Sequence, residues 1–255
     1  MASPAIQSFA TRDAAADARS QAALTALAGR GARKSQDIWV VNAATVSLGV
    51  DFNAMVAATQ IWLDVYHNPA WGIACKLRTG GTPPAGAWVV TLVDLDTTVR
   101  GALGYHAITN GVPYGRVLVQ TTLGYGEPVS VVLGHEVGEI LADPHVNLLA
   151  STPTGVIHAV ENCDAVEDTD FKINGIVMTN FQYPAWFEAG NTKGPYDAMK
   201  LCKAPFQLLK GGYSNIYTNG VWSQIFGSQE AEAKFFARHG GNTPVFMPGV
   251  RAEDY

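Results

Sequence analysis

The stretch from Val129 to Pro144 carries three side chains that could bind and use a metal ion. His135 and Glu139 are four residues apart, so on a helix both side chains leave the same face, one turn apart. Glu136 lies beside His135 and points toward the neighbouring edge of that face. The spacing is that of the metal-binding helix His-Glu-x-x-His, with Glu in place of the second His. The same residues are also compatible with a solvated helix face that bears a His–Glu pair.

Apolar residues around the motif favour the metal interpretation. Val132, Val137, Ile140 and Leu141 recur at helical spacing and would bury the helix against a sheet. A buried helix with one His and two carboxylates needs something to compensate those charges, and a metal ion would do so. Asp143-Pro144 should end the helix, because the residue before a proline is pushed out of the α region.

A catalytic zinc needs three protein ligands and an open position. The helix would supply His135 and Glu139, and the third ligand must come from another segment. Asp143 lies about 12 Å from His135 along a regular helix axis, which is too far for one ion. Glu161 is the preferred third ligand and Asp164 is the alternative, since both follow a short strand after the helix. The other interpretation of this acidic block is a solvated surface loop.

One His with two carboxylates is an oxygen-rich ligand set. Zinc is the expected ion, and calcium or manganese remain open. Two anionic ligands should leave a bound water less acidic than two neutral His ligands would. A poor hydrolase, or a protein that is no hydrolase, is therefore also compatible with the motif.

If the site is catalytic, Glu136 would be the general base for a water activated by the ion. A nearby Tyr or His would stabilise the oxyanion. The candidates are Tyr105, His106 and Tyr183, which could also contact substrate, and His106 is preferred. The alternative for His106 is an ordinary loop histidine with no part in catalysis.

Composition narrows the function further. The chain has 255 residues, 47% of them hydrophobic, which suits one domain with extensions. The net charge of −5 and the absence of a Lys/Arg cluster argue against nucleic acid as a partner. No apolar run is long enough to span a membrane, and no signal peptide is recognisable, so we expect a cytoplasmic protein, or a virion protein if phage-encoded.

The three cysteines form no Cys-x-x-Cys pair, so neither a disulfide framework nor a thiolate zinc site is predicted. A cysteine hydrolase that uses Cys163 and His158 is disfavoured, because nothing around Cys163 resembles a nucleophile motif.

Periodicity predicts an α+β fold with an α/β-like order of layers, in which a mixed sheet is backed by two helices. The expected strands are residues 37–46, 73–77, 88–93, 117–122 and 156–160. A helix opened by Asp51 should run to Tyr66 and be closed by Pro69. Hairpins are expected at Asn174-Gly175 and Asn219-Gly220.

Three regions follow from this pattern. Residues 1–34 form an Ala-rich arm with a helix expected over about Ala10 to Leu27, either a surface helix or an arm that docks on a neighbouring subunit. Residues 35–227 form the main domain. Residues 228–255 form a helix, capped by Ser228 and running from Gln229 to about Arg238, followed by an extended tail.

The order of elements and the His-Glu helix resemble those of the zincin metallopeptidases. More closely, the chain resembles a family of bacterial and phage zincin-like proteins over about Asp37 to Trp222. The resemblance depends on six pieces in this order: Ala102–His106, Gly111–Gly115, Gly134–Pro144, Glu161–Asp164 with Glu167-Asp168, Tyr183–Phe187 and Gly211–Tyr213. It implies the zincin-like fold and a metal ion rather than a particular reaction.

Two functions are therefore compatible with the sequence. The first is a metal-dependent peptidase, in which an edge strand around Val117 to Thr121 pairs with an extended peptide or protein substrate. The second is a non-catalytic zincin-fold protein, for example a virion or assembly component that contacts neighbouring subunits. The Ala-rich arm and the Gly/Pro-rich tail favour the second, whereas Glu136 beside His135 favours the first.

Overall fold

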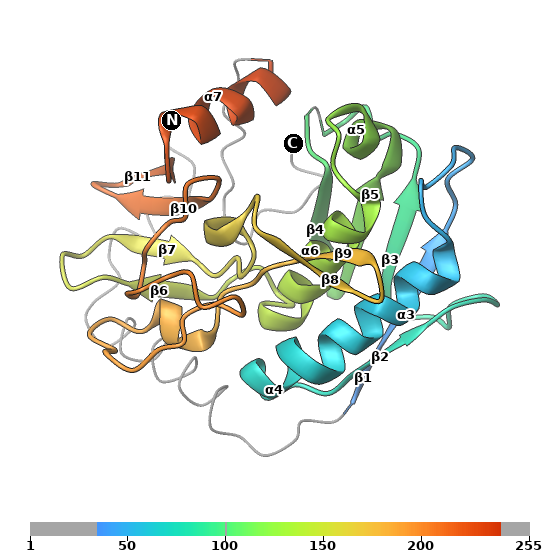
Figure 1. Ribbon diagram of the computed structural model, residues 1–255, viewed down its shortest axis with the longest axis horizontal. Helices are drawn as coiled ribbons and strands as arrows, with labels where there is room; N and C mark the ends of the chain where they lie inside the picture. The colour runs from blue at the N-terminus through green and yellow to red at the C-terminus, as the bar shows by residue number, and fades with distance from the viewer. Residues whose placement is uncertain (1–34, 100, 241–255) are drawn as a thin grey trace.

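The computed structural model describes residues 35–99 and 101–240, and every structural statement below refers to them (Figure 1). The arm over residues 1–34, with its expected helix, and the tail from residue 241 onward lie outside the described residues. The described chain is an α+β protein, as predicted from its sequence pattern.

The main sheet is mixed and has five strands in the order β2-β1-β3-β5-β4. Four of them are parallel: β1 (Gln36–Asn42), β2 (Cys75–Arg78), β3 (Trp88–Val93) and β5 (Val112–Leu118). The fifth, β4 (Gly104–Thr109), runs antiparallel to β5 and forms one edge of the sheet.

Two predictions about this sheet are wrong. Residues 119–122 were expected to be strand, but they belong to helix α5 (Val119–Gly124), where Thr122 Oγ1 donates a hydrogen bond to Leu103 O at 3.1 Å. Strand β5 starts earlier and lies inside the sheet, so β4 is the edge strand. The Asn110-Gly111 turn that joins β4 to β5, with φ of 49° and 78°, is a hairpin signal that sequence analysis passed over.

Helix α3 (Phe52–Trp62) begins as predicted at Asp51, whose carboxylate accepts a hydrogen bond from Ala54 N at 2.8 Å. The helical path then continues through a π-helical turn (η1, Leu63–His67) and α4 (Asn68–Trp71). Pro69 therefore does not close the helix. It lies inside the path, directly after the π-helical turn in which Asn68 N–H donates to Leu63 O, and Gly72, with φ of 65°, ends the path instead.

Helix α6 (Val129–Ala142) carries the His-Glu-x-x-Glu motif and ends at Asp143, as predicted. The four apolar positions named above are all buried, which confirms that the helix packs into the core. Helix α6 contacts β3, β4, β5, β9 and α3, and Figure 1 shows both helices in front of the main sheet. Gly138 makes the helix crossing possible, because an added Cβ would lie 3.0 Å from Trp62 Cη2.

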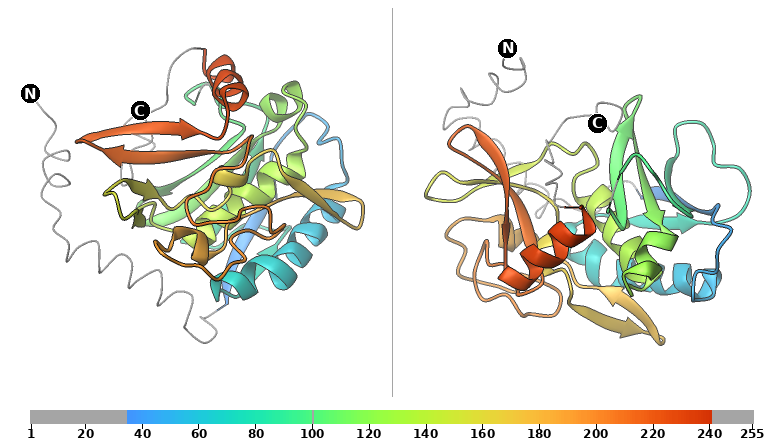
Figure 2. Two further views of the ribbon diagram at one scale, coloured as in Figure 1. Left: turned by 60° about the vertical axis from the view of Figure 1, so that its left-hand side comes forward. Right: turned by 90° about the horizontal axis from the view of Figure 1, so that it is seen from above.

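Residues 143–240 pack on the other side of α6 (Figure 2). It contains a four-stranded sheet in the order β11-β10-β7-β6 and a separate hairpin, β8-β9. The strands are β6 (Leu149–Ser151), β7 (Ile157–Ala159), β8 (Asp170–Ile173), β9 (Ile176–Thr179), β10 (Tyr213–Thr218) and β11 (Val221–Phe226). Two short 3-10 helices also occur, η2 (Asp164–Val166) and η3 (Pro184–Phe187).

Local signals in this half are confirmed. Both Asn-Gly turns join antiparallel strands and have positive φ at each residue, 50° and 83° at Asn174-Gly175, and 52° and 83° at Asn219-Gly220. Helix α7 (Gln229–Arg238) has the predicted limits, and Ser228 Oγ accepts a hydrogen bond from Ala231 N at 3.1 Å.

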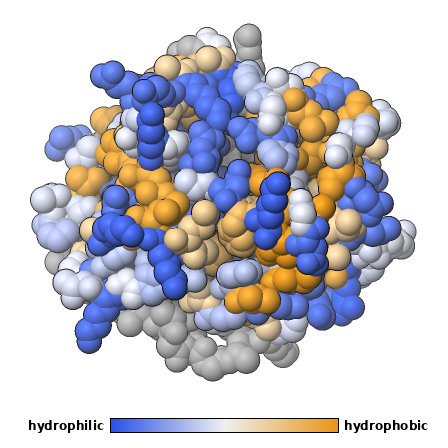
Figure 3. Space-filling model, viewed as in Figure 1, coloured by the Kyte–Doolittle hydropathy of each residue, from blue (hydrophilic) through white to orange (hydrophobic). Residues whose placement is uncertain are grey.

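Apolar residues are visible in patches between hydrophilic ones on the face seen in Figure 3. Such exposed apolar area is usual for folded proteins. Among the described helices, none has both the length and the apolar character needed to cross a membrane.

Candidate metal centre

Six titratable side chains from three separate segments meet in the interior beside α6. Helix α6 supplies three of them, strand β4 supplies one, and the segment that follows β7 supplies two. They are His135, Glu136, Glu139, His106, Glu161 and Asp164. The four carboxylates and His106 are buried, with side chains at most 7% exposed, and the His135 side chain is 16% exposed.

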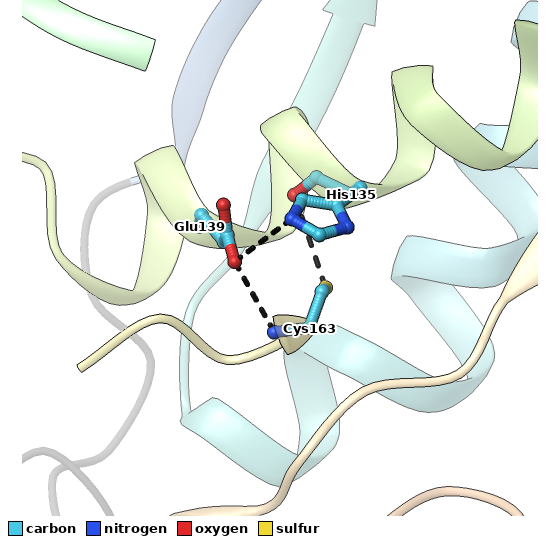
Figure 4. A group of neighbouring side chains, drawn as sticks. All are labelled: His135, Glu139 and Cys163. Atoms are coloured by element: carbon cyan, nitrogen blue, oxygen red, sulfur yellow. Dashed lines mark hydrogen bonds and ion pairs between the residues drawn. The ribbon is translucent and has the colours of Figure 1, made fainter. Parts of the chain in front are cut away.

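Two carboxylate oxygens from different segments lie beside Nε2 of His135. Its Nε2 lies 3.1 Å from Glu139 Oε1 and 3.2 Å from Asp164 Oδ1. Atoms that share a tetrahedral ion at 2.0–2.1 Å lie about 3.3 Å apart, but on this face of α6 the group whose ligand atoms all lie within 4.8 Å of one another is His135, Glu139 and Cys163, without Asp164. Figure 4 shows that His135 and Glu139 leave the same face of α6, as their spacing predicted, with Cys163 facing them from the segment after β7.

Around His106 a second group of carboxylates gathers. His106 Nδ1 lies 3.5 Å from Glu136 Oε2 and 3.5 Å from Glu139 Oε2. The other ring nitrogen, Nε2, lies 3.5 Å from Glu161 Oε2. The two oxygens of Glu139 therefore face different histidines.

Several buried polar atoms of this cluster have no hydrogen-bond partner among the described residues: His106 Nε2, Glu136 Oε2 and Glu161 Oε2. Their neighbours are close enough for ion pairing but do not have hydrogen-bond geometry. Leaving such groups unsatisfied in the interior costs about 1–3 kcal/mol each, and more for charged groups. A cation among them would remove that cost, so the residues present fit a metal ion.

Burial and mutual contacts shift the pKa values of several side chains in the cluster. Burial lowers the pKa of His106, but the carboxylates of Glu161, Glu136 and Glu139 outweigh it and raise the pKa to about 10. Burial raises the pKa of Glu139 to about 7, with Asp164 adding to the rise and His135 opposing it. Burial also raises the pKa of Glu161 well above its ordinary value, and His106 opposes that rise. Without a cation, ionisation of Glu139 and Glu161 is therefore unfavourable.

Glycine at position 104 lets Glu136 approach strand β4. A Cβ at Gly104 would lie 2.5 Å from Glu136 Oε1, 2.7 Å from Val132 Cγ1 and 2.8 Å from Arg116 O. The absence of a side chain there leaves room for the Glu136 carboxylate between the helix and the edge strand.

The cluster lines a cavity of about 580 Å³. Apolar residues of β4 and α6 form part of its wall, and α7 contributes Phe235 and Arg238. Arg238 Nη1 lies 3.5 Å from Glu167 Oε1, so α7 is attached beside the acidic segment. The volume is within the range of about 300–1,000 Å³ that is usual for ligand pockets.

The structure separates the two candidates for the third ligand. Asp164 is the carboxylate beside His135, whereas Glu161, the preferred candidate, faces His106. Asp143 is buried and its Oδ2 accepts a hydrogen bond from Leu148 N at 2.6 Å, a contact that organises the turn after α6.

The two tyrosines have different positions. Tyr105 lines the cavity, and its hydroxyl donates a hydrogen bond to Asp96 Oδ2 at 2.8 Å. Tyr183 is not among the residues described as lining that cavity, and its ring packs 5.4 Å from that of Phe181. Tyr105 and His106 are neighbours on β4, so their side chains leave opposite faces of the strand, and neither tyrosine side chain contacts the cluster.

Cys163 was not predicted to be a ligand, because the three cysteines form no Cys-x-x-Cys pair in the sequence. Its ligand atom lies within 4.8 Å of those of His135 and Glu139. Its backbone N–H donates to Glu139 Oε1 at 3.3 Å, and its thiol donates to His135 O at 3.8 Å. Cys163 directly precedes Asp164, and this position in the acidic segment could have indicated the cysteine as a ligand. His158, the proposed partner in a cysteine hydrolase, bonds instead to Ser214 Oγ at 2.8 Å.

No protein-family model, curated protein or solved structure matches the chain.

Proposed function

We propose that the protein is a metal-dependent hydrolase that holds a divalent cation between His135, Glu139 and Asp164 and cleaves peptide bonds. The observation that carries this proposal is the convergence of two histidines and four carboxylates in one buried cluster with unpaired polar atoms.

Charge balance supports a cation. Four ionised carboxylates carry four negative charges, and a protonated His106 would balance one of them, whereas His135 must be neutral to coordinate the ion. Buried charges that lack compensation are strongly unfavourable, and a divalent cation would balance two of the three that remain. Zinc suits the imidazole and carboxylate ligands best, while the number of oxygens leaves calcium and manganese as alternatives.

A bound cation would lower the pKa of a water and polarise a carbonyl group. Glu136 is proposed to accept the proton, because its Oε2 has no hydrogen-bond partner among the described residues and lies beside the ligand Glu139. His106, whose pKa of about 10 keeps it protonated at neutral pH, is proposed to stabilise negative charge on the substrate oxygen.

An extended peptide is the proposed substrate. Strand β4 carries His106 and forms an edge of the main sheet, with β5 as its partner among the described strands. Its outer side could pair with an extended chain by strand addition, which would bring a peptide bond past the cluster.

Metal analysis tests the proposal. The wild type, dialysed against low free zinc, is expected to retain one equivalent by plasma mass spectrometry. His135→Ala should lose that equivalent, whereas His145→Ala, which removes an exposed histidine beyond the end of α6, should retain it. No zinc, calcium or manganese in the wild type, with thermal stability unchanged by chelator, would refute the proposal.

Peptide hydrolysis then separates an enzyme from a structural protein. A quenched-fluorescence peptide library should be cleaved by the wild type, while Glu136→Gln should keep the first ion and lose activity. A protein that binds the ion but cleaves no peptide would instead favour the non-catalytic assembly component.

A further inference from the structure

The carboxylate of Glu139 lies between two histidines from different elements. Its Oε1 is 3.1 Å from His135 Nε2 on α6, and its Oε2 is 3.5 Å from His106 Nδ1 on β4. A carboxylate held in this way has one oxygen available on each side. In two-metal sites the ions lie about 3.5–4 Å apart, a separation that a single carboxylate can bridge.

The residues on the His106 side form a second ligand set. His106, Glu136 and Glu139 each offer a ligand atom, and these atoms lie within 4.8 Å of one another. The His106 Nδ1 contacts of 3.5 Å to Glu136 Oε2 and Glu139 Oε2 are close to the separation of about 3.3 Å expected for ligands that share one small ion.

An independent observation indicates a ligand at this position. Glu136 Oε2 is buried and has no hydrogen-bond partner within the described ranges, although it is directed toward His106 Nδ1. On the far side of the ring, Glu161 Oε2 lies 3.5 Å from His106 Nε2. A carboxylate at the second nitrogen of a histidine is the usual arrangement that orients a metal-binding imidazole.

The charges of the cluster also favour a second cation beside His106. Glu136, Glu139, Glu161 and Asp164 carry four negative charges when ionised, and one divalent ion balances two of them. A second divalent ion would balance the remainder while leaving both histidines neutral and able to coordinate. The competing arrangement has a protonated His106 in place of that ion.

We propose that the cluster contains a second divalent-cation position, formed by His106, Glu136 and the shared carboxylate of Glu139. It rests on the proposed function, because Glu139 also belongs to the first position. The second ion enters a site that already holds two positive charges, so it binds more weakly than the first. Its occupation uses Glu136 Oε2, the proposed proton acceptor, so excess metal inhibits hydrolysis.

Zinc titration of the full chain tests the second position. Equilibrium dialysis against rising free zinc, with plasma mass spectrometry of the protein, should give two steps for the wild type. His106→Ala and Glu136→Gln should keep the first step and lose the second. Glu161→Gln, which changes the partner of the other His106 nitrogen, should weaken the second step about 10- to 100-fold. His145→Ala should keep both steps.

The outcomes separate the two proposals. A single step in the wild type that is unchanged in His106→Ala overturns the second position and leaves the first in place. No zinc at any concentration overturns both. A second step that survives His106→Ala and Glu136→Gln but disappears in His145→Ala shows surface binding and overturns the second position. Glu136→Gln preserves the shape of the side chain, so the test stands if His106→Ala fails to fold by circular dichroism.

Discussion

Replacement of Gly104 by Ala tests whether the candidate site depends on close contact between β4 and α6. The added Cβ would lie 2.5 Å from Glu136 Oε1, 2.7 Å from Val132 Cγ1 and 2.8 Å from Arg116 O. Unstrained carbon contacts are about 3.5–4.0 Å, so each of these is too short by roughly 1 Å. The two side-chain atoms can move, but Arg116 O belongs to the backbone of β5, which pairs with β4.

The expected cost follows from that distinction. Added methylene groups in a packed core destabilise the folded state by about 1–3 kcal/mol. Because one of the three contacts is with rigid backbone, Gly104→Ala should destabilise the protein by roughly 2–3 kcal/mol. For a protein of this size the melting temperature should fall by about 4–12 °C. The displacement of Glu136 should also weaken the second zinc step, while the first, at His135 and Asp164, should persist.

Urea and thermal unfolding of Gly104→Ala and Gly124→Ala measure the effect. Gly124 is the last residue of α5, and an added Cβ would have no described heavy atom within 4 Å. Gly124→Ala should therefore be as stable as the wild type or more stable by up to about 1 kcal/mol. If Gly104→Ala unfolds within about 0.5 kcal/mol of the wild type, the close packing of β4 on Glu136 is refuted.

Two further predictions concern the scaffold. Burial lowers the pKa of His67 to about 3, below the ordinary value of 6.5, so the unfolded chain binds this proton first and stability is lost as the pH falls from 6.5 toward 3. Between pH 7.5 and 5 the free energy of unfolding of the wild type should therefore fall by about 2 kcal/mol more than that of His67→Phe, as measured by urea denaturation at both pH values. Equal losses in the two proteins would contradict a neutral buried histidine. Ser228→Ala should remove the hydrogen bond to Ala231 N and destabilise α7 by about 1 kcal/mol, whereas Ser228→Asp should retain it. Hydrogen exchange of α7 amides would show the difference, and identical exchange in both variants would exclude a role for the cap.

The sequence predicted best where the deciding residues are neighbours in the chain. The caps at Asp51 and Ser228, the two predicted Asn-Gly turns and the end of α6 at Asp143 all have their expected form. Each depends on backbone preferences or hydrogen bonds that reach only a few residues, so tertiary packing had little opportunity to change them.

Predictions failed where distant contacts override local preference. Residues 119–122 contain β-branched side chains that favour a strand, yet they form helix α5 beside the start of β4, where Thr122 Oγ1 donates to Leu103 O. Pro69 was expected to end a helix, but it follows a π-helical turn, and the helical path continues through it to Trp71. Position in the assembled fold decided both outcomes.

The sequence by itself determined that His135 and Glu139 share one face of a buried helix, because 3.6 residues per turn place them together wherever the helix lies. Only the tertiary structure decided which residues meet them. Asp164 faces His135, and Glu161 faces His106, although the two acids come from the same short segment. That choice depends on how β4 and the segment after β7 approach α6, and sheet order and burial set this approach rather than sequence spacing.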